Sequence, residues 1–245
     1  DPNRTLLETD TTKFEFSSRV RALKKSFKSE FKSCPRTTLG LEPFMVSDIL
    51  FVYVESSCLA WRIAVGCSVA VTFKLCMRFD CASRLRWDDS YCVITSSYIR
   101  FYLDGCKNLQ YSGRWCDDAK PSDQSFGVYH ALCKGKRIFQ SGFVFSRIIK
   151  GTNGVHAVDT SAPMSREQFV AHSRAALSVI GISSDLVELF TAKSSRIGAA
   201  SAAVTAQLSP ADISFLSRTK STNWVSYYDE KNLAQRLRVN QAIGC

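Results

Sequence analysis

Residues 191–228 read TAKSSRIGAASAAVTAQLSPADISFLSRTKSTNWVSYY, and this stretch decides how the fold is interpreted. It opens with a Lys-x-x-Arg pair, Lys193 and Arg196, which precedes a run of small residues. Alanine is the strongest helix former, so the run predicts a helix over residues 198–206. Two cations therefore stand at the start of a predicted small-residue helix.

Two further helices are predicted in the same stretch. One begins at Ser209, a good N-cap, because Pro210 suits the first helical position. The other begins near Ser221 and carries two adjacent phenols, Tyr227 and Tyr228. Short links between the helices bring the phenols near the two cations. Because cations bind phosphate oxygens and a tyrosine hydroxyl can act as a nucleophile, the pattern indicates a phosphate clamp beside a candidate nucleophile.

This stretch resembles the C-terminal catalytic box of the tyrosine recombinase (phage integrase) family. The family pattern is His/Lys-x-x-Arg, then Gly-Ala-Ala, then a helical hairpin, then His or Trp shortly before the nucleophilic tyrosine. The segments SSRIGAASAA and SRTKSTNWVSYY are most similar to the forms found in eukaryotic mobile elements. The resemblance implies that Lys193 and Arg196 bind the phosphate and that Tyr227 is the nucleophile. Tyr228 fits a longer spacing and stays open as the alternative.

A second motif lies upstream, where residues 75–89 read LCMRFDCASRLRWDD. Taken alone, an arginine after a buried helix, such as Arg78, is most simply interpreted as a salt-bridge partner. The segment is similar to the first arginine box of the family, however, which implies that Arg78 is the other half of the clamp. The family also carries a catalytic lysine on the hairpin that follows this box. Lys107 matches that position and would be the general acid, although a lysine at a hairpin tip is usually an exposed residue without a role.

The chain departs from the family pattern at two positions. The family usually has Glu or Asp three residues after the first arginine, where this chain has Cys81, with Asp80 one residue earlier. The His/Trp position before the tyrosine falls on Thr219, or on Arg218 in the longer-spaced form. These departures leave a second reading open, in which the chain is a catalytically inactive DNA-binding protein with the same fold.

Composition limits the class of partner. A net charge of +10, from 32 Lys and Arg against 22 Asp and Glu, favours nucleic acid before an anionic membrane. The chain has ten cysteines but no Cys-x-x-Cys, and only three histidines, so no metal site and no cofactor are expected. The cysteines lie mostly in apolar runs, as thiols do in a reducing compartment, which predicts a nuclear or otherwise intracellular protein.

No membrane span and no RNA-binding module are predicted. The apolar run over residues 58–76 is interrupted by Arg62 and Lys74 and is too short between them to cross a bilayer. The second class considered, a basic RNA-binding protein, is disfavoured because no aromatic RNA-recognition signature is visible. Double-stranded DNA is therefore the expected partner.

The N-terminal region contains a basic helical face. Its cations recur at the spacing of one side of a helix, which suits either a solvated surface or a grip on DNA phosphates. The resemblance implies that this segment is the end of an upstream DNA-clamping domain, with residues 1–36 as its remnant and residues 37–245 as the catalytic domain. The five cations are Arg21, Lys24, Lys25, Lys28 and Lys32.

The remaining pattern predicts a mainly α-helical fold with a small antiparallel β-sheet, of the tyrosine recombinase catalytic-domain type. Helices are expected over residues 46–56, 57–74, 128–133 and 165–180, a strand over 91–103 and a partner strand over 110–116. His172 and Arg174 form a second His-x-Arg with the wrong spacing, and they are expected to be structural.

The function implied is metal-free cleavage and rejoining of DNA through a 3′-phosphotyrosine. Arginine suits the clamp because its guanidinium forks onto two oxygens and stays charged. The resemblance further implies site-specific recombination or integration for a mobile genetic element, by a homotetramer assembled on DNA.

Overall fold

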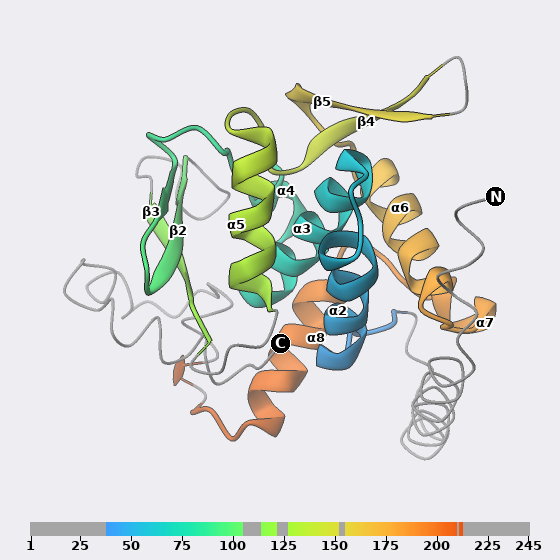
Figure 1. Cartoon of the computed structure of the whole chain (residues 1–245). Coiled ribbons are helices and arrows are strands. Elements are labelled where there is room, and N and C mark those ends of the chain that lie inside the picture. The colour runs from blue at the N-terminus through green and yellow to red at the C-terminus, as the bar shows by residue number, and fades with distance from the viewer. Residues whose placement is uncertain (1–37, 105–113, 122–126, 152–154, 210, 213–245) are drawn as a thin grey trace.

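Helix α3, Ala60–Lys74, lies at the centre of the fold (Figure 1). The computed structural model describes residues 38–104, 114–121, 127–151, 155–209 and 211–212. Every residue of α3 from Ile63 to Lys74 is buried, because the sequence is apolar or small on all sides. The small residues allow close packing: a Cβ on Gly66 would lie 2.4 Å from Val54 Cγ2. The buried helix predicted over residues 57–74 is confirmed, with its start moved to Ala60.

Helix α2, Pro43–Leu50, continues directly into a π-helical turn, η2, Phe51–Glu55. Pro43 stands at the first helical position, where its missing N–H costs nothing. Lys134, from a later part of the chain, caps the C-terminal end of this turn. Its ammonium donates to the carbonyl oxygens of Val54 at 2.6 Å, Glu55 at 3.2 Å and Ser57 at 3.1 Å. One half-buried lysine thus satisfies three carbonyls at and just beyond the end of the π-helical turn.

Three strands, β1 (Cys92–Ile94), β2 (Tyr98–Leu103) and β3 (Arg114–Ala119), form an antiparallel sheet in the order β1-β2-β3. The single strand predicted over residues 91–103 is wrong. The hydroxyl of Thr95 accepts hydrogen bonds from the backbone N–H groups of Ser97 and Tyr98, and this turn divides the segment. The partner strand, predicted over residues 110–116, is described from Arg114 to Ala119.

Helix α5, Val128–Phe139, packs on α3 and on the sheet (Figure 1). The prediction of a short helix over residues 128–133 missed its second half, because Gly135 reads as a helix breaker. In the structure Gly135 is needed for packing, since a Cβ there would lie 2.8 Å from Cys67 Sγ and 3.0 Å from the Trp87 ring. Contact with α3 therefore outweighs the low helix propensity of glycine.

A two-stranded ribbon, β4 (Ser146–Lys150) and β5 (His156–Pro163), lies at the opposite end of the molecule from helix α8 (Ser194–Thr205) in Figure 1. The sequence predicts some strand within residues 139–149 but a loop over most of β5, so β5 is a correction. Its residues are mostly half-buried or exposed, and the alternation that marks a strand is weak.

The helices after the ribbon agree better with expectation. Helix α6, Arg166–Val179, begins where the helix over residues 165–180 was predicted, and its N-cap is Ser165, whose hydroxyl accepts from the Gln168 N–H at 3.1 Å. Two short helices, α4 (Phe79–Ala82) and α7 (Ser184–Val187), complete the described elements. The seven cysteines within the described residues all carry free thiols. The predicted class, mainly α with small antiparallel β-sheets, is confirmed.

Candidate functional site

The chain reverses direction at the end of α3, and this reversal presents Arg78. The N–H of Met77 donates to the Thr72 carbonyl at 3.0 Å, and the N–H of Cys76 donates to the Phe73 carbonyl at 2.9 Å. These two bonds form a Schellman motif, in which Cys76 takes the left-handed position with φ 48. Arg78 follows as the N-cap residue of α4, with its side chain exposed.

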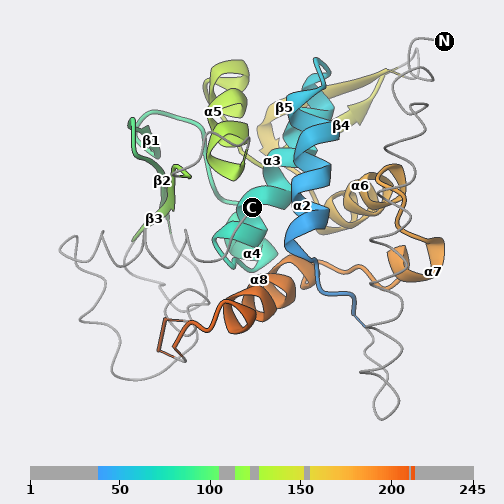
Figure 2. The same ribbon diagram turned by 60° about the horizontal axis from the view of Figure 1, so that its bottom comes forward.

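The end of α3 packs directly on the first turn of α8, and we call this contact the α3–α8 junction (Figure 2). The thiol of Cys76 donates to the carbonyl oxygen of Arg196 at 3.7 Å, although the two residues are 120 positions apart. Next to it, the hydroxyl of Thr72 bonds that of Ser195 at 3.2 Å. The segment that carries Arg78 and the segment that carries Arg196 are therefore in contact.

Gly198 explains how α8 can come so close. A Cβ at this position would lie 1.8 Å from the Leu41 carbonyl oxygen, a distance that no side chain can occupy. The Leu41 N–H also donates to the Ser194 carbonyl at 3.2 Å. The glycine of the predicted Gly-Ala-Ala sequence thus allows backbone-to-backbone contact at the start of α8.

Lys193 immediately precedes α8. Its own N–H donates to the Thr191 hydroxyl at 3.2 Å, and the Thr191 N–H donates to the Ser194 hydroxyl at 2.8 Å, so two side chains fix the turn. The Lys193 side chain is exposed, whereas that of Arg196 is half-buried. Within the described residues, no carboxylate forms an ion pair with Arg78 or Lys193. The junction therefore presents cations on an exposed surface.

Of the helical hairpin predicted after α8, the structure describes the end of α8 and the first residues of the next segment, and the rest lies outside the described residues. Helix α8 ends in a second reversal, in which Gln207 has φ 57 and the Leu208 N–H donates to the Ala203 carbonyl at 3.0 Å. The Ser209 hydroxyl then accepts from the Asp212 N–H at 3.1 Å, as a helix N-cap does.

Several predicted site residues lie outside the described residues. They are Lys107, Thr219, Tyr227, Tyr228 and the five N-terminal cations Arg21, Lys24, Lys25, Lys28 and Lys32. The two ends of the segment that contains Lys107 are described, and they are adjacent because Leu103 on β2 pairs with Arg114 on β3. The flanks of the predicted hairpin are thus in place.

Asp80 and Cys81, the positions that depart from the family pattern, face different surroundings. The carboxylate of Asp80 forms a surface ion pair with Arg166 of α6. Cys81 is half-buried and packs against the hydrophobic core. Asp80 is therefore bound to a neighbouring helix, and it does not replace the carboxylate expected at the position of Cys81.

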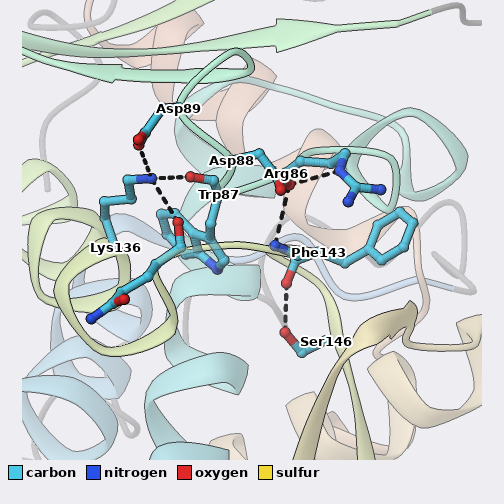
Figure 3. Close-up of polar contacts among 9 residues, drawn as sticks. Arg86, Trp87, Asp88, Asp89, Lys136, Phe143 and Ser146 are labelled. Atoms are coloured by element: carbon cyan, nitrogen blue, oxygen red, sulfur yellow. Dashed lines mark hydrogen bonds and ion pairs between the residues drawn. The ribbon is translucent and has the colours of Figure 1, made fainter.

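The residues after α4 form a polar network that the sequence did not predict (Figure 3). Asp88 accepts from Arg86 Nε at 2.8 Å and from the Gly142 N–H at 3.2 Å, and the Arg86 hydrogen bond holds the pKa of Asp88 below its usual value. Lys136 of α5 bonds Asp89 at 2.7 Å and the Trp87 carbonyl. The network fastens the segment downstream of Arg78 to the end of α5.

The second His-x-Arg is structural, as expected. His172 packs in an aromatic cluster with Trp61 and His156, at ring distances of 6.2 and 5.8 Å. Arg174 bonds the Glu188 carboxylate at 2.8 Å and the Phe190 carbonyl at 3.1 Å, which joins α6 to the segment after α7.

None of the described helices has both the length and the apolar character needed to cross a bilayer.

No protein-family model and no curated protein sequence matches the chain. Solved structures do. XerH site-specific recombinase bound to difH substrate, in a pre-cleavage complex, matches with a TM-score of 0.50 and 11% identity, over 81% of this chain and 52% of that chain. Its post-cleavage complex with palindromic difH gives a TM-score of 0.51 and 10% identity, over 82% and 53%.

A Flpe–Holliday junction complex gives a TM-score of 0.49 and 12% identity, over 86% of this chain and 51% of that chain. The chain thus spans about half the length of these recombinases. At such low identity the similarity concerns the arrangement of the backbone. The chain has the fold of a tyrosine recombinase catalytic domain.

Proposed function

We propose that this chain cleaves and rejoins DNA strands through a 3′-phosphotyrosine, in site-specific recombination or integration for a mobile genetic element. The observation that carries the proposal is the α3–α8 junction, where the Cys76 thiol meets the Arg196 carbonyl and joins two arginine-bearing segments. Because fold alone does not imply function, these contacts and the cations beside them are the basis of the proposal. The similarity to recombinases adds support at the level of the fold.

The cations at the junction suit a phosphodiester. In the proposed mechanism Arg78 and Arg196 bind the non-bridging oxygens of the scissile phosphate, and Lys193 adds a third donor. Arginine remains charged and can bind two oxygens at once, which stabilises charge as it develops in the transition state. The Schellman motif fixes the backbone before Arg78, and the Gly198 contact fixes the backbone next to Arg196.

Two residues complete the proposed chemistry. The Tyr227 hydroxyl gives up its proton to solvent and attacks phosphorus, which forms the phosphotyrosine bond and breaks the bond to the 5′ oxygen of the next nucleotide. Lys107 donates a proton to that leaving oxygen. A lysine close to other cations loses its proton more readily, since like charges disfavour its protonated form. Rejoining reverses the step, because the phosphotyrosine link conserves the energy of the broken bond.

We further propose that residues 37–245 form the catalytic domain and that duplex DNA is held partly by the five N-terminal cations, within a homotetramer assembled on DNA. Phosphate contacts release counterions, so binding must weaken steeply with salt. The measurement is the dissociation constant for a duplex at several salt concentrations. A constant that stays flat between low and moderate salt would contradict the phosphate contacts.

The decisive experiment traps the covalent intermediate on a nicked duplex, followed on a denaturing gel. We expect an adduct from the unmodified chain and none from Tyr227→Phe, because only the attacking hydroxyl is removed, while DNA binding stays intact. Tyr228→Phe is the matched control and should still form the adduct. An adduct that survives Tyr227→Phe but is lost in Tyr228→Phe would reverse the assignment.

A second function is favoured by one observation. Asp80 is held by Arg166, and the neighbouring position is Cys81, so no carboxylate among the described residues stands where the family pattern has one. A chain that binds DNA but has lost its chemistry is consistent with this. The absence of any adduct on a duplex that the unmodified chain demonstrably binds would favour this inactive DNA-binding protein.

A further inference from the structure

Two oppositely charged side chains, one at the end of α3 and one on β3, are buried without a direct hydrogen bond between them. Asp118 of β3 is 1% exposed, and neither of its carboxylate oxygens has a hydrogen-bond partner among the described residues. Lys74, the last residue of α3, is 5% exposed and is the charge that acts on Asp118 across the core. Burying a carboxylate without hydrogen bonds costs free energy, so the position of Asp118 needs a physical explanation.

The neighbouring aspartate of the same strand does have a hydrogen-bonded cation as its partner. Asp117 is also buried, but its carboxylate bonds Arg100 Nε of β2 at 2.9 Å. Successive residues of a strand face opposite sides of the sheet, so Asp118 faces away from Arg100. Asp118 is thus directed to the side of the sheet where Lys74 is its charged partner.

We propose that Asp118 is a positioning residue, which acts through Lys74 to hold the three-stranded sheet against the turn that presents Arg78. Lys74 precedes the Schellman motif, and Cys76 in that motif contacts Arg196, so a shift of Lys74 moves both arginine-bearing segments. On the sheet side, β3 is the strand that follows the segment containing Lys107. This inference rests on the proposed function of the same site.

The electrostatics give the pair a signature in pH. Burial raises the pKa of Asp118 to about 6 from its ordinary 3.8, and the charge of Lys74 opposes that rise. Cys133 of α5 also interacts electrostatically with Asp118, which, besides burial, raises the pKa of its thiol, while Tyr129, Arg137 and Lys120 act on Cys133 in the opposite direction. Below pH of about 6 Asp118 is therefore neutral, and Lys74 loses its counter-charge.

Stability and activity then respond to acid in opposite directions. The folded pKa of Asp118 is above the unfolded value, so between the two the folded protein binds more protons than the unfolded chain. The contribution of Asp118 to the free energy of unfolding therefore rises as pH falls through about 6. The positioning attraction between Asp118 and Lys74 disappears over the same range, so the rate of adduct formation falls. A purely structural aspartate would not separate these two responses.

The test compares Asp118→Asn with the adjacent control Asp117→Asn across pH, using the rate of adduct formation on the nicked duplex and DNA affinity. We expect Asp118→Asn to lower the rate about tenfold at neutral pH with unchanged affinity, since displacements well under 1 Å cost rate. Its rate should also lose the inflection near pH 6. Asp117→Asn should keep that inflection. Retention of both the full rate and the inflection in Asp118→Asn would overturn the proposal.

A readout without catalysis separates this inference from the proposed function. Carboxyl NMR of the unmodified chain should show Asp118 titrating near pH 6, and Lys74→Met should move that titration to higher pH because the opposing charge is removed. If the unmodified chain forms no adduct but the titration moves, the proposed function fails while the buried pair stands. If Lys74→Met leaves the titration unchanged, the pair itself is refuted.

Discussion

Cys76 offers the sharpest test of the α3–α8 junction, because two of its properties can be removed separately. Its side chain is 1% exposed, its backbone is left-handed with φ 48, and its thiol donates to the Arg196 carbonyl. Cys76→Ala removes the thiol but keeps the strained backbone. Cys76→Gly removes the thiol and the strain together.

The expected stabilities follow from these terms. Loss of the buried sulfur costs about 1 kcal/mol of burial, and loss of its hydrogen bond costs roughly 0.5–1 kcal/mol more. Cys76→Ala should therefore destabilise the fold by about 2 kcal/mol. Glycine relieves about 1–2 kcal/mol of left-handed strain but adds roughly 0.5–1 kcal/mol of chain entropy. Cys76→Gly should accordingly cost about 1 kcal/mol, less than alanine.

The rate of adduct formation should not follow the stabilities of the two variants. Both substitutions remove the contact with Arg196, so both should slow adduct formation by about tenfold, whatever their stability. Cys76→Ser restores a donor and should recover most of the rate. The assays are urea unfolding and single-turnover capture of the nicked duplex. A glycine variant with the full rate would refute the positioning role, and rates that follow stability would reduce Cys76 to a packing residue.

Gly198→Ala should destabilise the protein by about 3 kcal/mol or more in urea unfolding, because its Cβ would overlap the Leu41 carbonyl. Gly40→Ala is the control: its Cβ would meet only a side chain, at 3.3 Å, so it should cost under about 1 kcal/mol. Lys134→Met should cost about 1–3 kcal/mol, since three carbonyls at the end of η2 lose their donor; an unchanged urea midpoint would contradict that role. Cys81→Glu should raise the rate of adduct formation by restoring the carboxylate of the family pattern, and an unchanged or lower rate would mean that the clamp is oriented in another way.

The sequence predicts the helical part of this fold well where burial and capping act locally. The run that became α3 is apolar or small around most of its circumference, and Ser165 is a strong N-cap, so both helices follow from nearby residues. The sheet is harder, because a single hydroxyl, that of Thr95, decides that residues 91–103 make two strands. Strand β5 shows little alternation of buried and exposed residues, and it pairs only with β4 in a two-stranded sheet of the described residues.

For the site, motif spacing predicts Arg78, Lys193 and Arg196, but it does not predict which contacts hold these residues in place. The Thr72–Ser195 and Cys76–Arg196 contacts join segments that are far apart in sequence, so no local pattern encodes them. Lys74 did leave a signal, as a charge at the end of an apolar helix. Only the fold could reveal that its partner is Asp118 of β3.

The burial of α3 from Ile63 to Lys74 has a consequence for how the domain opens. Its backbone amides from Ile63 to Lys74 are covered by α2, α5, α6 and α8 at once, so no single neighbour can detach and expose them all. Their exchange with deuterium must then wait for cooperative unfolding of the whole domain, whereas the exposed edges of the β4–β5 ribbon can exchange through local fraying. The slowest amides of α3 therefore give a direct measure of the global free energy of unfolding.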